Sequence, residues 1–228
     1  MKLFLSNHGL KVKLQSRYYG HVLFILCALS LALIIIGVPT SNFTYKLART
    51  VFAASTSNVS SNPPGLLTYK NDSYGVNIQY PANWSSNPGE GNDNSGDSST
   101  DIVTFSPKDT SASSSATFDV SVDKVDSSEN LKQYVSDSIS DNKIDLKNYT
   151  ASEPTLNGVT LAGTPAYIVI YSFTDQGENI KGLETGTIVG NKVYFITYEN
   201  SPSKFDSDLP TVQKMIDSFK LTSSKSSG

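Results

Sequence analysis

The segment at residues 74–84 (YGVNIQYPANW) most constrains the fold, because it joins a strand pattern, a strand stop and the chain's single tryptophan. Apolar and polar residues alternate from Val76 to Tyr80, which is the period of a half-buried strand. Pro81 has no N–H to donate to a sheet ladder, so the strand is expected to end there. We interpret three residues of the segment as structural, with the large indole in a buried position: Tyr80, Pro81 and Trp84.

Several other segments show strand patterns. Residues 167–173 are apolar at nearly every position, which predicts a central strand covered on both faces. Residues 118–122 alternate, with Asp119, Ser121 and Asp123 on the polar side, and this predicts a strand with one solvated face. The pair Gly190-Asn191 predicts a hairpin turn. Further strands are expected at 67–70, 102–105, 183–189 and 193–198, and residues 86–101 are expected to form a long exposed loop.

Two amphipathic helices are predicted. The first spans residues 127–142, with Asp126 and Glu129 in the pattern of a capping box. The second spans residues 208–220, with Pro210 in its first turn. Because strands do not alternate regularly with helices, the pattern indicates an α+β fold, an antiparallel β-sheet flanked by helices.

The N-terminal part contains an unbroken apolar run at residues 22–38, which is at the lower limit of length for a membrane-spanning helix. Four basic residues precede it, which favours an inside N-terminus and a translocated remainder. We therefore expect one N-terminal apolar helix that anchors an extracytoplasmic domain; the alternative is a cleaved signal and a secreted protein. The expected organisation is a basic cytoplasmic N-terminus (1–21), a transmembrane anchor or signal core (22–38), a Ser/Asn/Pro-rich stalk (39–65), a folded domain (66–220) and a disordered tail (221–228).

Charge is unevenly distributed along the chain. All six charged residues up to Val51 are basic, whereas the remainder has 21 acidic residues against twelve lysines, a net charge of −9. Phosphates would repel such a domain, so nucleic acid is not an expected partner. Five Asn-X-Ser/Thr sequons follow the apolar run, and each could accept a glycan on a translocated domain: Asn42, Asn58, Asn71, Asn83 and Asn148.

The types of residue in the domain restrict its chemistry. Both histidines and the only cysteine lie within the first 27 residues, which excludes a Ser-His-Asp triad, a Cys-His pair and a zinc or copper site with nitrogen or sulfur ligands in the domain. We assign no catalytic or cofactor-binding residue and expect no enzymatic activity. A carboxylate pair such as Asp119 with Asp123 could still support hydrolysis, but an ordinary solvated surface is the favoured interpretation.

Two further features leave alternatives open. The acidic loop offers oxygen ligands for calcium at Asp93, Asp97 and Asp101, but the spacing departs from the EF-hand pattern, and a simple acidic loop is favoured. The strand tyrosines could form a recognition face; the favoured interpretation places them at the edge of the core with their hydroxyls in water. These tyrosines are Tyr80, Tyr167, Tyr171, Tyr194 and Tyr198.

Four segments in this order resemble PsbP-like domains: residues 74–84, 163–167 (GTPAY), 191–198 (NKVYFITY) and 212–219 (VQKMIDSF). The resemblance covers residues 66–220 and implies an α/β/α sandwich, an antiparallel sheet with helices on both faces. In plants and cyanobacteria such domains are extrinsic, lumen-side subunits of photosystem II, which help to retain calcium and chloride near the oxygen-evolving cluster, or assembly factors. This chain departs from them in its apparent anchor and in the inserted loop at 86–101.

The resemblance best implies a non-enzymatic accessory or assembly protein that binds a membrane-associated protein complex at the outer face of the membrane. Two other classes of function remain as alternatives. The first is a surface module that binds calcium or another small ligand. The second is a carboxylate-dependent hydrolase.

Overall fold

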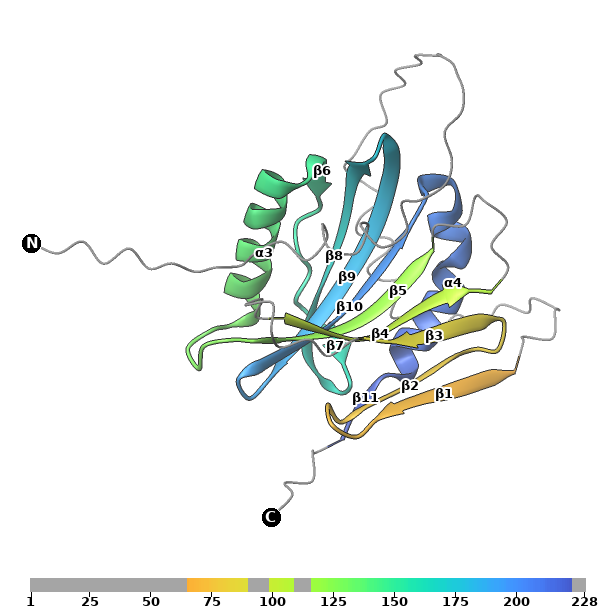
Figure 1. The fold of residues 1–228 in the computed structure, drawn as a ribbon. Helices are drawn as coiled ribbons and strands as arrows, with labels where there is room; N and C mark the ends of the chain where they lie inside the picture. The colour runs from red at the N-terminus through yellow and green to blue at the C-terminus, as the bar shows by residue number, and fades with distance from the viewer. Residues whose placement is uncertain (1–64, 90–98, 109–115, 223–228) are drawn as a thin grey trace, which may run out of the picture.

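The computed structural model describes residues 65–89, 99–108 and 116–222, which form two antiparallel sheets and two helices (Figure 1). The predicted apolar helix at 22–38, the stalk up to residue 64, loop residues 90–98 and the tail from residue 223 lie outside the described residues. In the described part of the chain, no helix is long and apolar enough to cross a membrane.

The smaller sheet has the strand order β1-β2-β11. Strand β1 (Leu66–Asn71) pairs with β2 (Val76–Pro81), and β11 (Lys220–Leu221) pairs with the other side of β2. The β1–β2 turn is closed by Asn71, whose Oδ1 accepts hydrogen bonds from the backbone N–H groups of Ser73 and Tyr74. Strand β2 ends at Pro81, as the sequence predicts.

The larger sheet joins the remaining described strands, all paired antiparallel. The predicted hairpin is confirmed, because only Gly190 and Asn191 separate β9 from β10. The predicted strand at 167–173 is covered on both faces but lies beside the edge strand, so it is not central. The strand order is β3 (Trp84–Pro88), β4 (Ser99–Pro107), β5 (Thr117–Lys124), β10 (Lys192–Asn200), β9 (Glu178–Val189), β8 (Thr164–Asp175) and β6 (Lys147–Ala151), with β7 (Thr160–Leu161) paired to the start of β8.

The prediction of one loop over residues 86–101 is wrong at both ends. Residues 86–88 belong to β3, and β4 begins at Ser99. Ser86 lies opposite Phe105, and Asn87 lies opposite Thr104, in a regular antiparallel register. Ladder hydrogen bonds come from the backbone, so an edge strand forms here without any aliphatic side chain of its own.

Both helices begin at other residues than the sequence predicts. Helix α3 (Leu131–Asp145) is capped by Asn130, whose side chain accepts a hydrogen bond of 3.1 Å from the backbone N–H of Gln133, so the predicted capping box at Asp126 is wrong. Helix α4 (Pro202–Ser218) begins earlier than predicted and therefore contains Pro210 in its interior. Its first turns are held by Phe205, which is buried and stacks on Tyr198 with ring centroids 5.1 Å apart.

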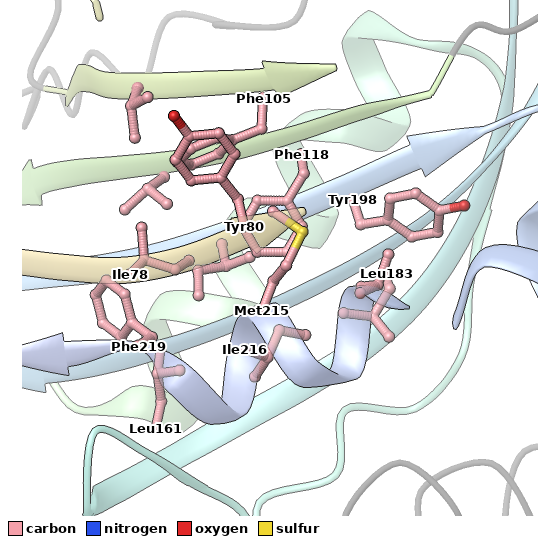
Figure 2. Close-up of a cluster of buried hydrophobic side chains, with 14 of the residues drawn as sticks. Ile78, Tyr80, Phe105, Phe118, Leu161, Leu183, Tyr198, Met215, Ile216 and Phe219 are labelled. Carbon is pink, nitrogen blue, oxygen red and sulfur yellow. The ribbon is translucent and has the colours of Figure 1, made fainter. Parts of the chain in front are cut away.

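The main hydrophobic core lies between the large sheet, the small sheet and α4. Figure 2 shows Ile78 and Tyr80 of β2, Phe105 and Phe118 of the large sheet, and Met215 of α4 meeting in this core. On the opposite face of the large sheet, Tyr134 and Val135 of α3 pack against Tyr167, Val169 and Val193. Figure 1 shows the two helices on opposite sides of the sheet, which confirms the predicted α+β fold with helices on both faces.

Candidate functional site

Five carboxylates lie on the α3 side of the large sheet, and we call them the acidic face: Asp101, Asp119, Asp123, Glu184 and Glu199. Their common side follows from the register, because directly opposite residues in paired strands share a face. Asp123 lies opposite Val193, which packs under α3. Thr197 lies between Asp119 on β5 and Glu184 on β9.

The predicted solvated face of β5 is wrong. The exposed fractions of Asp119 and Asp123 are only 1% and 3%, and Ser121 is fully buried. Hydroxyl groups from neighbouring strands take the place of water as hydrogen-bond donors. Thr104 Oγ1 donates to Asp119 Oδ1 at 2.6 Å, and Ser121 Oγ donates to Asp101 Oδ1 at 2.7 Å.

Two tyrosine–glutamate pairs complete the acidic face. The hydroxyl of Tyr171 on β8 donates to Glu199 Oε1 on β10 at 2.7 Å, and the hydroxyl of Tyr167 donates to Glu184 Oε1 at 2.6 Å. Gly182 of β9 lies opposite both Tyr171 and Glu199, so its missing side chain gives the ring room to reach across the strand. Gly186 does the same for Tyr167: a Cβ atom there would lie 2.8 Å from the tyrosine ring.

Burial raises the pKa of Tyr167 and Tyr171 well above the ordinary value of 10.0, and the negative charges of Glu184 and Glu199 raise it further. Both phenols therefore stay protonated at neutral pH and act as hydrogen-bond donors. The interpretation of these hydroxyls as wet is wrong, because both side chains are buried and bonded to carboxylates. It is also wrong for Tyr198, whose hydroxyl accepts a 3.2 Å hydrogen bond from Asn200 Nδ2.

The acidic face is built for internal hydrogen bonding. Its carboxylates accept from Thr104, Ser121, Tyr167 and Tyr171, all of which belong to the same sheet. Asp119 and Asp123 lie four residues apart along one strand, a Cα separation of about 13 Å.

The residues suggested for calcium are divided between described and undescribed parts of the chain. Asp93 and Asp97 lie outside the described residues, whereas Asp101 lies on β4 in the acidic face. In the ranges that the structure describes, no group of three or more His, Cys, Asp or Glu side chains could hold a metal ion.

Three of the five sequons fall within the described residues, and Asn42 and Asn58 do not. Asn83 is exposed in the turn between β2 and β3, and Asn148 is exposed in β6 with a positive φ of 56°. The Asn71 side chain closes the β1–β2 turn and also donates to the Tyr69 hydroxyl at 3.3 Å.

The three residues interpreted as structural lie close together in the fold. Tyr80 and Trp84 are buried in the main core, and the Tyr80 ring centroid lies 4.7 Å from that of Phe105. Pro81 closes β2.

Sequence reasoning missed Glu184, Glu199 and the two glycines. A signal for them exists, because Tyr167 and Tyr171 are spaced by four residues on one strand, and Gly182 and Gly186 are spaced by four on the next. In an antiparallel hairpin this equal spacing can bring each ring over a glycine. The midpoint of the glycine pair is Glu184, which then faces the same side.

A separate cleft of about 670 Å³ lies between the C-terminal end of α4, β11 and the β7–β8 turn. The residues Asp217, Lys220 and Thr160 contribute to its lining. The turn residues Ala162 and Gly163 have φ angles of 52° and 78°, the left-handed pair that a two-residue hairpin needs. The volume is within the range of small-molecule sites.

Comparison with known proteins places the fold. The chain matches the family of PsbP-like proteins over residues 27–221. No curated protein matches it. Among solved structures, it is similar to cyanobacterial PsbP (CyanoP) from Synechocystis, with 13% identity, coverage of 73% of this chain and 98% of that chain, and a TM-score of 0.52.

It is also similar to LpqN of Mycobacterium tuberculosis, described as involved in cell envelope biogenesis, with 10% identity, coverage of 72% and 87% of the two chains, and a TM-score of 0.49. At 13% identity, the likeness to CyanoP speaks for the fold alone. The family match extends over most of the sequence and includes both sheets and both helices. The chain therefore belongs to the PsbP-like protein family.

Proposed function

We propose that this PsbP-like chain is a non-enzymatic accessory protein, anchored through its N-terminal apolar segment, that binds a membrane-associated protein complex on the outer side of the membrane. The observation that carries the proposal is the internal bonding of the acidic face. In the acidic face, tyrosine, serine and threonine hydroxyls of the sheet donate hydrogen bonds to the carboxylates. Such an arrangement supports a rigid binding scaffold more than a reaction centre.

The anchoring part of the proposal rests on the sequence. The apolar run at 22–38 is preceded by four basic residues, and the 27 residues from 39 to 65 separate it from β1. A linker of this length and composition has a typical end-to-end distance on the order of 30 Å. The domain would then lie within reach of the exposed parts of a neighbouring membrane protein.

The test is recovery of a partner with the full chain. A tagged chain is purified from detergent-solubilised membranes of its own host, and co-purifying proteins are quantified. The expected result is a membrane protein in stoichiometric amount. A matched control is a chain lacking residues 1–38 behind a cleavable export signal, which reports how much of the recovery depends on the anchor. Absence of any stoichiometric protein from the full-chain sample contradicts the proposal.

Topology is tested separately. Protease added to intact cells is expected to remove the domain while sparing a tag at residue 1. A tag at residue 1 that is digested, or a domain that is protected until the membrane is opened, contradicts the proposed orientation.

The cleft beside α4 favours a second candidate, a module that binds a small polar ligand. Lys220, at the start of β11, and Asp217, in the last turn of α4, offer charges of opposite sign three residues apart. Nuclear magnetic resonance screening with small zwitterionic compounds would shift the amide signals of Thr160 and Lys220, and Lys220→Ala should abolish the shifts. Unchanged spectra at millimolar compound remove this candidate.

A further inference from the structure

Strand β1 is the outermost strand of the small sheet, with β2 on one side and no described strand on the other (Figure 1). Its hydrogen-bonding direction can be read from its neighbours. Ala82 donates its backbone N–H to the carbonyl of Gly65, and the alternation of an antiparallel ladder then turns Leu67, Tyr69 and Asn71 toward β2. Leu66, Thr68 and Lys70 therefore direct their backbone N–H and C=O groups away from the sheet.

The opposite side of β2 confirms this alternation. Gln79 lies opposite Thr68. The backbone N–H of Gln79 points away from β1, because it donates a hydrogen bond of 2.8 Å to Ser218 Oγ. The backbone groups of Thr68 are thus those of an open edge. We call Leu66, Thr68 and Lys70 the open edge of β1.

The open edge lacks most of the devices that protect edge strands. Its register with β2 is regular from Leu66 to Asn71, without a bulge. Leu66 and Leu67 keep 53% and 43% of their surface exposed and are two of the four large apolar residues exposed in the described ranges. The only charge on the strand is Lys70, whose Nζ lies 2.7 Å from Asp72 of the following turn. An edge strand with a regular register and exposed leucines at one end is suited to pairing with another strand.

We propose that the open edge of β1 binds an extended segment of the membrane-associated partner, which adds to the small sheet as a further strand. This proposal rests on the proposed function and names the surface through which it operates. Backbone hydrogen bonds to Leu66, Thr68 and Lys70 supply the general affinity, and apolar side chains of the partner strand cover Leu66 and Leu67.

The position of β1 in the chain favours a partner at the membrane. It is the first described strand, so it follows directly on the 65 residues that contain the apolar run. The open edge therefore lies at the end of the domain from which the chain leads back to the proposed anchor. An exposed loop or terminus of a membrane protein can reach it without spanning the domain.

A second copy of this chain fits the open edge less well. The part of the chain after Val51 has a net charge of −9, so two copies repel each other. Antiparallel pairing of two β1 strands about Thr68 would also place the apolar Leu66 opposite Lys70, and such a pair offers little favourable contact.

The test compares edge variants of the full chain in the co-purification experiment. Thr68→Pro removes an outward N–H and blocks strand addition while leaving the β2 ladder intact. Leu66→Lys adds a charge at the same edge. Ile144→Lys is the matched control, because Ile144 is 81% exposed on α3, away from the small sheet. We expect both edge variants to reduce recovery of the partner at least about tenfold, an effect of about 1.4 kcal/mol, and the control to leave it unchanged.

The outcomes separate the two proposals. Equal recovery by wild type and by both edge variants overturns the edge proposal and leaves the accessory function standing. Absence of a partner even from wild type overturns both. A photoreactive residue at position 68 in cells is expected to crosslink to the recovered partner, and crosslinking to a second copy or to residues 1–64 of the same chain overturns the proposed occupant. Circular dichroism of each variant shows whether loss of recovery reflects unfolding, and Leu66→Lys, at an exposed site, remains decisive if Thr68→Pro unfolds.

Discussion

The hydroxyl of Tyr171 reaches across the whole of strand β9 to donate to Glu199 at 2.7 Å. The two residues lie on strands that do not pair with each other, and Gly182 is the residue between them. Strands β8 and β10 are thereby joined by side chains across β9, in addition to the backbone ladders. Because both partners are buried, the hydrogen bond is made where water cannot replace it.

Gly182→Ala should displace this tyrosine. A Cβ atom at Gly182 would overlap the Tyr171 ring, so the ring must move away from Glu199 or the strands must separate. We expect the free energy of unfolding to fall by about 2–4 kcal/mol, the combined effect of overpacking and a lost buried hydrogen bond. Urea unfolding measures it. Gly65→Ala is the control, since nothing lies within 4 Å of a Cβ at Gly65. Equal stability of the two variants would show that the ring does not depend on the glycine.

Stability should decline in alkaline solution. The pKa of Tyr167 and of Tyr171 is raised in the folded state, whereas the unfolded chain has the ordinary value of 10.0. Below that pH both states keep the protons, and the stabilisation is complete. Above pH 10.0 the unfolded state loses protons that the folded state retains. Each of the two tyrosines then lowers the free energy of unfolding by about 1.4 kcal/mol per pH unit, until the pH reaches its pKa in the folded state. Urea unfolding at pH values on both sides of 10.0 tests this.

Tyr167→Phe tests whether the buried tyrosines cause this decrease of the free energy of unfolding with rising pH. One buried phenol fewer should make the alkaline loss of stability less steep, because fewer protons distinguish the unfolded from the folded state. Ultraviolet absorbance of phenolate should show the remaining buried tyrosines ionising together with unfolding. Ionisation of every tyrosine near the ordinary pKa, before any loss of structure, would rule out the buried hydrogen bonds.

Asn130 and Asp126, which both precede α3, should differ in their contribution to the free energy of unfolding. Asn130 caps the helix by accepting from Gln133, whereas only the backbone carbonyl of Asp126 accepts a hydrogen bond in the preceding turn. We expect Asn130→Ala to lower the free energy of unfolding by about 1 kcal/mol and Asp126→Ala to change it by less than about 0.5 kcal/mol. Thermal unfolding of both variants tests the helix start. A larger loss of stability for Asp126→Ala than for Asn130→Ala would instead support the capping box at Asp126 that the sequence alone suggests.

Ala162→Gly should stabilise the β7–β8 turn. Ala162 has a φ of 52°, a left-handed conformation that is costly for a residue with a Cβ atom. Glycine adopts it without strain, so we expect a gain of about 0.5–1 kcal/mol after its larger unfolded-state entropy is counted. Ala82→Gly, at a turn residue without a positive φ, should instead reduce stability. Scanning calorimetry of the two variants distinguishes these opposite signs.

The fold class could be predicted because the strands with a strong pattern lie inside their sheets, each between two neighbouring strands. Alternation at 76–80 and 118–122 and the turn at Gly190-Asn191 report local preferences that tertiary structure reinforces. Strand β3 escaped prediction because Ser85, Ser86 and Asn87 have no preference for a strand. They are held by the register of β4, a long-range effect that a local pattern does not contain.

The acidic face could not be predicted from the polar pattern alone. Alternating aspartates on β5 have the same pattern whether their neighbours are water or hydroxyl groups from other strands. Thr104 lies 15 residues from Asp119 in the chain, and Tyr171 lies 28 residues from Glu199. Recognising these contacts requires the strand order, in which β10 is inserted between β5 and β9.

The pairing of β2 with β11 gives the domain a late step in its assembly. Val76 lies opposite Leu221, so the first hairpin of the domain is completed by the final residues that the structure describes. A chain that emerges from a ribosome or a translocation channel with its N-terminus first must keep this side of β2 unpaired until nearly all of the domain has emerged. Any factor that accompanies the emerging chain would therefore meet an unfinished sheet, and release of the last strand would be the event that closes it.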